Sequence, residues 1–213
     1  MSFFDYLSYN GGNKGVEMSD IKSALEIAME KVEKLEKATD EERLKWKYAP
    51  EGEKLAARYL KEECNLVAEL GKYEEKTTKY VVDGATEILT RNIGLPRNHL
   101  TRGNNKRAMD GLKIVKSDKV AVENVYSKIR RIFEHYMGQG AQQRKQAYEA
   151  LRSEFEAKIR QAVQQQLGSL VGIKIDVEKQ PQFQEEWRRV EGQLNSQYLK
   201  LLDEYKQELL VIP

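Results

Sequence analysis

Apolar residues recur at intervals of three and four positions along most of this chain. One such stripe follows Ser19, a residue favoured at helix N-caps, and two more follow Asp118 and Pro181. Proline suits the first turn of a helix, where its missing N–H group costs no hydrogen bond. The spacing keeps one narrow apolar face against a partner helix, as in a coiled coil. The three stripes are Ile21, Leu25, Ala28, Val32 and Leu35; Val122, Val125, Ile129, Ile132 and Tyr136; and Phe183, Trp187, Val190, Leu194, Tyr198, Leu201 and Tyr205.

Three further helices are predicted between these stripes. Pro50 is expected to separate the first of them from the helix that starts at Ser19, because proline disfavours helical geometry in the residue before it. Gly138 is expected to interrupt the chain before the last of them. The predicted ranges are about 51–70, 72–93 and 141–167.

The segment 94–117 lacks helical periodicity. It contains three glycines and Pro96, the residue types that most often punctuate regular structure. We therefore predict a basic, irregular connector at 94–117. It would join an N-terminal helical region, 18–93, to a C-terminal helical region, 118–213.

Two short segments alternate apolar and polar residues, which is the pattern of a β-strand. They are residues 112–115 and residues 171–177. A single short strand would leave backbone hydrogen-bonding groups unsatisfied, so the two are expected to pair. A small two-stranded element is thus predicted, with its second strand near 170–177.

Together these patterns predict a mainly α fold, namely an elongated, coiled-coil-rich bundle of about six helices with the small two-stranded β element. The composition agrees, since only 4 of the 213 residues are proline and Glu, Lys, Gln, Leu and Ala are abundant. Residues 1–17 precede the first predicted helix and are expected to form a flexible N-terminal extension.

The composition also bears on the location of the protein. Cys64 is the single cysteine, so no disulfide can form within the chain. No apolar run approaches the roughly 20 residues that cross a bilayer, and no secretory signal is visible. We expect a cytoplasmic protein without a membrane span.

Charge is segregated along the chain although the total is close to neutral. The whole chain carries +2, whereas residues 91–119 hold eight Lys and Arg against two Asp and therefore carry +6. This segment is a candidate site for nucleic acid or another polyanion. Aromatic residues, on which unpaired bases stack, are absent from 94–117, which weakens this interpretation. The candidate contact residues are Arg97, Arg102, Lys106 and Arg107.

The N-terminal extension carries a cluster of aromatic and apolar residues ahead of a glycine-rich spacer. Such a cluster on a tether is suited to docking in a groove of another chain. The alternative is a dispensable extension, because Met18 stands directly before the first predicted helix. The candidate docking residues are Phe3, Phe4, Tyr6, Leu7 and Tyr9.

Residues suited to catalysis or metal binding are few. The chain has two histidines, His99 and His135, and their spacing to Cys64 and to the carboxylates matches no zinc or di-iron pattern. No phosphate-binding glycine loop and no nucleophile motif occurs. We therefore predict no metal site, no cofactor and no enzymatic activity.

The leading interpretation is a non-catalytic structural or interaction protein: a scaffold, adaptor or assembly factor acting through helix–helix association. The expected partner is a second copy or another protein. Glutamines flank the stripe between 139 and 166, and uncharged flanks let helices approach without like-charge repulsion. The alternative is polyanion binding through 91–119, with nucleic acid as the less favoured partner. An enzyme without a recognisable motif is the third interpretation.

Overall fold

A computed structural model describes Met29 and residues 38–167 and 176–213 of the chain. It divides into two compact units, residues 1–43 and 44–213. The predictions for the extension 1–17, for its aromatic cluster and for most of the helix after Ser19 lie outside the described residues. Everything below concerns the second unit, apart from the first residues of its opening helix.

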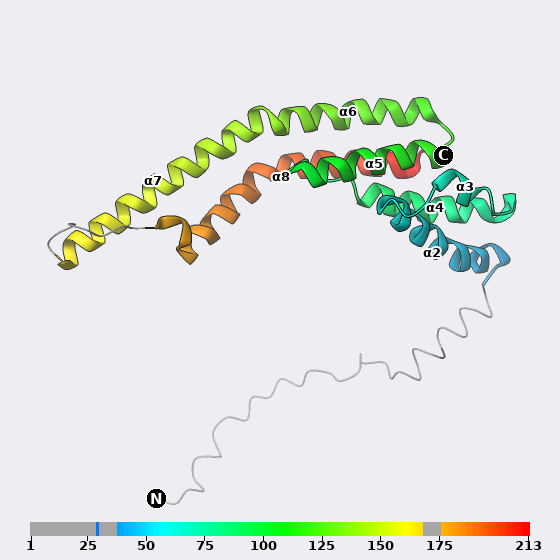
Figure 1. Cartoon of the computed structure of the whole chain (residues 1–213), viewed down its shortest axis with the longest axis horizontal. Helices are drawn as coiled ribbons and strands as arrows, with labels where there is room; N and C mark the ends of the chain where they lie inside the picture. The colour runs from blue at the N-terminus through cyan, green and yellow to red at the C-terminus, as the bar shows by residue number, and fades with distance from the viewer. Residues whose placement is uncertain (1–28, 30–37, 168–175) are drawn as a thin grey trace, which may run out of the picture. The chain divides into compact units, whose positions relative to one another are not determined.

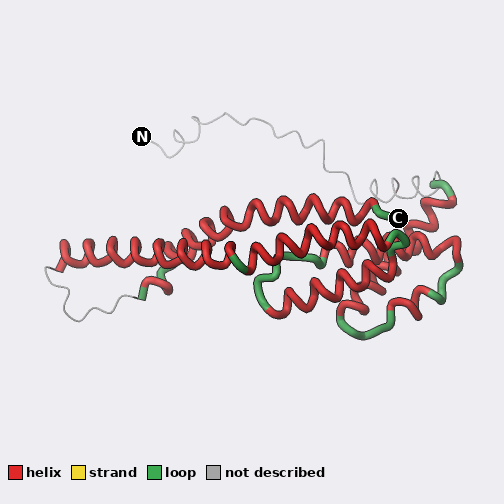
Figure 2. Tube along the Cα trace, turned by 90° about the horizontal axis from the view of Figure 1, so that it is seen from above, coloured by secondary structure: helices red, strands yellow, loops and turns green. Residues whose placement is uncertain are grey.

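The described part of the chain is a helical bundle, as predicted (Figure 1), and contains no strand (Figure 2). Within this unit α8 contacts α4, α6 and α7, and α5 contacts α3, α4 and α6. The elements are α2 (Asp40–Leu60), α3 (Leu66–Leu70), α4 (Glu75–Arg91), α5 (His99–Val115), α6 (Lys119–Met137), α7 (Gln139–Leu167), the 3-10 helix η1 (Val177–Lys179) and α8 (Pro181–Val211).

The prediction of an irregular connector is wrong for residues 99–115, because these form α5. Asn98 caps the helix, accepting from the N–H of Thr101 at 2.9 Å, while the Thr101 hydroxyl accepts from the N–H of Asn98. Gly111 serves close packing here and not a turn. A Cβ at that position would lie 2.8 Å from the Tyr59 ring and 2.9 Å from Leu89.

The two-stranded element is wrong for its first segment, since residues 112–115 belong to α5. Leu112 is buried on the α5 face that also buries Ala108 and Met109, which is helical spacing. Residues 170–175 lie outside the described part of the chain, and Val177 begins the short helix η1.

The predicted break at Pro50 is also wrong, because α2 continues through it. Ala49 and Gly52, on either side of the proline, approach the backbone of α4. This packing outweighs the hydrogen bond that proline removes. The chain breaks instead after Leu60, where Glu62 adopts a positive φ of 67° and Asn65 caps α3.

The stripe predicted for α6 is confirmed, since all five of its residues are buried. The stripe predicted for α8 is only partly correct. Leu202 is 2% exposed and Leu209 fully buried, whereas Leu201 is 41% exposed. In its C-terminal half, α8 therefore packs on α4 and α6 with a face that is shifted by one residue from the predicted stripe.

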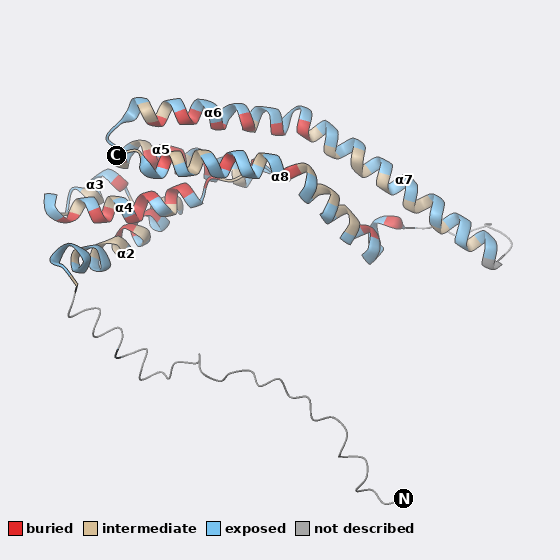
Figure 3. Cartoon of the chain, turned by 180° about the vertical axis from the view of Figure 1, so that it is seen from behind, coloured by how far each residue is buried: buried red, intermediate tan, exposed pale blue. Residues whose placement is uncertain are grey.

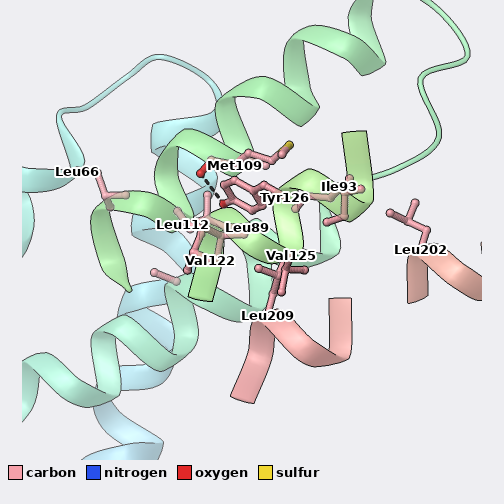
Figure 4. Close-up of a cluster of buried hydrophobic side chains, with 14 of the residues drawn as sticks. Leu66, Leu89, Ile93, Met109, Leu112, Val122, Val125, Tyr126, Leu202 and Leu209 are labelled. Atoms are coloured by element: carbon pink, nitrogen blue, oxygen red, sulfur yellow. Dashed lines mark hydrogen bonds between the residues drawn. The ribbon is translucent and has the colours of Figure 1, made fainter. Parts of the chain in front are cut away.

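The core lies where α4, α5, α6 and α8 meet (Figure 4). The Tyr126 hydroxyl of α6 donates to the carbonyl oxygen of Met109 on α5 at 2.6 Å, so this buried polar group is satisfied. Leu112, Val122 and Leu209 are fully buried around it.

The helices α7 and η1 and the first half of α8 form a separate part of this unit, which we call the arm (Figure 1). Within the arm, α7 and α8 contact each other through edge-to-face aromatic pairs. The ring centroid of Tyr148 lies 5.4 Å from that of Phe183 and 5.0 Å from that of Trp187. Buried residues line one face of α6 but not of α7 (Figure 3). Every residue from Ala141 to Gln165 is exposed or half-buried.

The backbones of α2 and α4 touch at two glycines. A Cβ on Gly52 would lie 1.9 Å from the carbonyl oxygen of Val81, and one on Gly84 would lie 2.0 Å from that of Ala49. Only glycine allows so close an approach. These two positions therefore fix the distance between the helices.

We predict that Gly84→Ala destabilises the protein by about 3 kcal/mol, since the added methyl group must push two backbones apart. Gly192→Ala is the matched control, because it lies inside α8 and a Cβ added there would meet nothing within 4 Å. It should stabilise the protein by about 1 kcal/mol through helix propensity. Urea unfolding followed by circular dichroism measures both; equal midpoints for the two variants would contradict the close contact.

Candidate functional site

Most basic side chains of the segment 91–119 have partners within the molecule. Arg91 pairs with Glu87 along α4 at 2.6 Å. Lys119 donates to the carbonyl oxygens of Lys113 and Lys116 and so caps the C-terminal end of α5. Much of the positive charge that distinguishes this segment thus compensates helix ends and carboxylates.

Lys116 is the most buried of these cations, with an exposed fraction of 6%. Its ammonium group donates to the carbonyl oxygens of Ile212 at 2.5 Å and Leu210 at 3.3 Å. Burial lowers the pKa of Lys116, while the charge of Asp83 opposes the shift. The cation satisfies carbonyl groups that the last turn of α8 leaves without partners.

Arg107, one of the four polyanion candidates, is directed toward α2. Its Nε donates to the carbonyl oxygen of Tyr59 at 2.6 Å, and its NH1 pairs with Glu62 at 2.5 Å. The guanidinium also lies over the Tyr59 ring, 4.9 Å from its centroid. Arg107 therefore holds the turn in which Glu62 has its positive φ.

Arg97, Arg102 and Lys106 are exposed and form no ion pair within the described part of the chain. Arg97 lies in the loop before α5. Arg102 and Lys106 lie one turn apart on α5 and share a face of it. The structure thus brings together two of the four candidates and directs Arg107 elsewhere.

Arg102 and Lys106 line a pocket of about 420 Å³ between α5 and α6, which we call the α5–α6 pocket. Most of its lining was not predicted from the sequence, because residues 99–115 were not expected to be helical and because four of the lining residues come from α6. The apolar lining residues are Pro96, Met109, Tyr126, Phe133 and Met137; the polar ones are Arg102, Asn105, Lys106, Asp110, Lys113 and Arg130.

Asn105 is buried and belongs to the scaffold of this pocket. Its side chain donates to the carbonyl oxygen of Gly94 at 2.6 Å and accepts from the N–H of Gly94 at 2.9 Å. These two bonds fix the α4–α5 loop, and with it Pro96, against α5. Both groups of this amide are consequently occupied within the protein.

Glu123 holds the far end of the pocket together. It accepts from Arg130 and Lys113, each at 2.6 Å. The hydrogen bond from Arg130, followed by that from Lys113, lowers the pKa of Glu123 from 4.5 to about 2. Burial raises the pKa of the neighbouring Tyr126, with the charge of Asp110 adding to the shift, so this hydroxyl stays neutral.

Two open grooves larger than this pocket lie elsewhere on the described part of the unit. One, of about 610 Å³, lies along the arm and is lined by apolar and mixed charged residues. The other, of about 580 Å³, lies between α6 and α8 and includes Leu194 and Leu201 of the predicted stripe. In it His135 Nδ1 lies 2.7 Å from the Tyr198 hydroxyl, so this histidine has a protein partner. The arm groove is lined by Leu151, Glu154, Phe155, Lys158, Gln182, Glu185, Glu186 and Arg189.

Two further kinds of site are absent from the described part of the chain. Within those ranges, no group of three or more His, Cys, Asp or Glu side chains is placed to hold a metal ion. None of the helices there combines the length and apolarity needed to span a membrane.

The described helices form a bundle with two distinct features. The α5–α6 pocket, which has cationic residues beside an apolar floor, lies on the part of the unit outside the arm, which we call the body. The open groove lies on the arm. Residues 67–211 match a protein family described as a family of unknown function, DUF6657, and the chain belongs to that family. The match contains the pocket and the arm, whereas α2 lies outside it. No curated protein matches the chain. No solved structure matches it either.

We predict that Glu123→Gln removes a pH-dependent part of the stability. A carboxyl group whose pKa is lowered by folding stabilises the folded state fully above its unfolded value, here about 4.5, and loses this contribution as the pH falls through about 2. The wild type should therefore exceed the variant in stability at pH 6, and the difference should shrink steadily toward pH 2. Chemical unfolding at several pH values measures it.

Glu134→Gln serves as the control, since it removes one carboxylate from the same helix without removing an ion pair in the described chain. A stability difference between wild type and Glu123→Gln that does not vary with pH would contradict the assigned role.

Proposed function

We propose that the chain is a non-catalytic interaction protein that self-associates through its arm. The observation that carries the proposal is the state of α7. Its apolar residues, among them Leu151, Phe155 and Ile159, are only half-buried although α8 already packs on them. Long helices gain most of their stability from tertiary packing, so a two-helix arm of this kind gains from further helices.

A second copy is the occupant that the charges favour. The arm groove carries Glu154, Glu185 and Glu186 together with Lys158 and Arg189. Glu154 pairs with Lys158 at 2.6 Å, so the face is nearly neutral. Two copies of such a face approach without net repulsion, and a two-fold arrangement places the same patch on both subunits. Two arms together would form a four-helix bundle.

The glutamines of α7 support the same choice. From Gln161 to Leu167 the helix carries no charge. A charged partner would leave this stretch without counter-charges, whereas an identical uncharged stretch packs beside it at no electrostatic cost. This is the basis for preferring a copy of the chain over an acidic or basic partner.

Polyanion binding across 91–119 has less support. Five of the eight cations in this segment are engaged inside the protein, which leaves Arg97, Arg102 and Lys106 for an external anion; the engaged ones are Arg91, Arg107, Lys113, Lys116 and Lys119. Nucleic-acid affinity grows with the number of phosphates neutralised, so three free cations favour it little.

A cytoplasmic location is part of this proposal. It rests on the single cysteine, Cys64, which is free and contributes no disulfide to stability.

The test is sedimentation velocity of the full chain across a wide concentration range. We expect a species of twice the mass of one chain that dissociates on dilution. Ile159→Glu should raise the dissociation constant roughly tenfold or more, because it places a charge in the proposed interface. Ser153→Glu, an exposed change on the opposite face of α7, is the matched control and should leave the constant unchanged.

Circular dichroism establishes whether both variants keep wild-type helix content. A monomer at every concentration of the wild type would overturn the proposal, as would equal weakening by Ser153→Glu and Ile159→Glu.

A further inference from the structure

The α5–α6 pocket combines unpaired positive charge with an apolar floor. Four cationic side chains line it, against one carboxylate, Asp110, and the nearby Glu123. Glu123 is already shared between Lys113 and Arg130. Asp110 follows Lys106 by one turn, yet no ion pair joins them in the described structure. Positive charge in excess of the carboxylates therefore remains at the end held by Arg102 and Lys106.

The floor of the pocket offers almost no polar group to a ligand. The Tyr126 hydroxyl already donates its proton to the Met109 carbonyl oxygen, and the side chain is fully buried. Phe133 is half-buried and Met137 is 38% exposed, and both lie on the same side of α6 as Arg130. An exposed apolar floor beside free cations suits a ligand with an apolar body and an anionic head.

The size of the pocket restricts this ligand further. A volume of about 420 Å³ lies within the range of about 300–1,000 Å³ that is usual for small-molecule sites. The head group would meet a guanidinium and an ammonium one helical turn apart, and Arg binds a carboxylate through two parallel hydrogen bonds. The other two cations that line the pocket, Lys113 and Arg130, are both paired with Glu123.

We propose that the α5–α6 pocket binds a small amphipathic carboxylate, such as a medium-chain fatty acid. Arg102 and Lys106 hold the carboxylate, and the alkyl chain lies over Met109, Phe133 and Met137. This site is separate from the arm and does not depend on self-association.

The test is isothermal titration of the full chain with decanoate, and with 1-decanol as the uncharged analogue. We expect one decanoate per chain and much weaker binding of decanol. Arg102→Gln and Lys106→Gln should each raise the decanoate dissociation constant roughly tenfold, since each removes a charged hydrogen bond. Met137→Gln should raise it as well, by removing part of the apolar floor.

Arg188→Gln is the matched control, because Arg188 is an exposed α8 arginine without an ion pair in the described chain. It should bind decanoate as the wild type does, and thermal unfolding confirms that every variant is folded. The proposal is overturned if decanol binds as tightly as decanoate, if several equivalents bind, or if Arg188→Gln weakens binding as much as Arg102→Gln. Displacement of decanoate by a single-stranded oligonucleotide in a salt-sensitive manner would instead assign the cations to a polyanion.

Discussion

The buried ammonium group of Lys116 constrains the rest of the bundle. A charge with so little access to water requires acceptors, and it finds them in the carbonyl oxygens at the C-terminal end of α8. This contact holds α8 at the corner between α5 and α6, where the N–H of Ser117 also donates to the Pro213 carbonyl oxygen at 2.9 Å. The position of α8 then determines which of its faces enters the core: Leu202 and Leu209 pack inward, and Leu201 remains accessible.

The sequence correctly predicted the helices whose apolar residues recur at helical spacing, because such spacing marks a single face that is buried against neighbouring helices. The stripe of α6 is buried as expected, and Pro181 begins α8. The prediction failed where polar or small residues take part in packing. Asn and Gly are typical of loops, yet here both lie in a helix. Asn105 forms hydrogen bonds with Gly94, and Gly111 leaves room for the Leu89 side chain. Pro50 suggested a helix end because the hydrogen bond that it removes belongs to its own helix. The packing that offsets this loss involves α4, which lies far along the chain.

The sequence predicted only part of the candidate site, again because local patterns do not show which distant residues come into contact. Arg102 and Lys106 were identified from local charge, and the structure places them at one pocket. Phe133 and Met137 belong to a different helix, so no local pattern linked them to these cations. Charge density alone also suggested Arg107, whose partners Tyr59 and Glu62 lie more than forty residues earlier. Separating cations that complete the fold from those that remain free required knowledge of tertiary contacts.

The 31-residue helix α8 belongs to both the body and the arm, and it spans about 46 Å at 1.5 Å per residue. The pocket lies on the body, between α5 and α6, while the groove lies on the arm. Two chains joined through their arms would therefore carry their pockets on separate bodies, and the joined arms would hold these pockets apart. Such a particle would be bivalent: a surface that displays many copies of a ligand would retain it far longer than a single pocket could, without any change in either site.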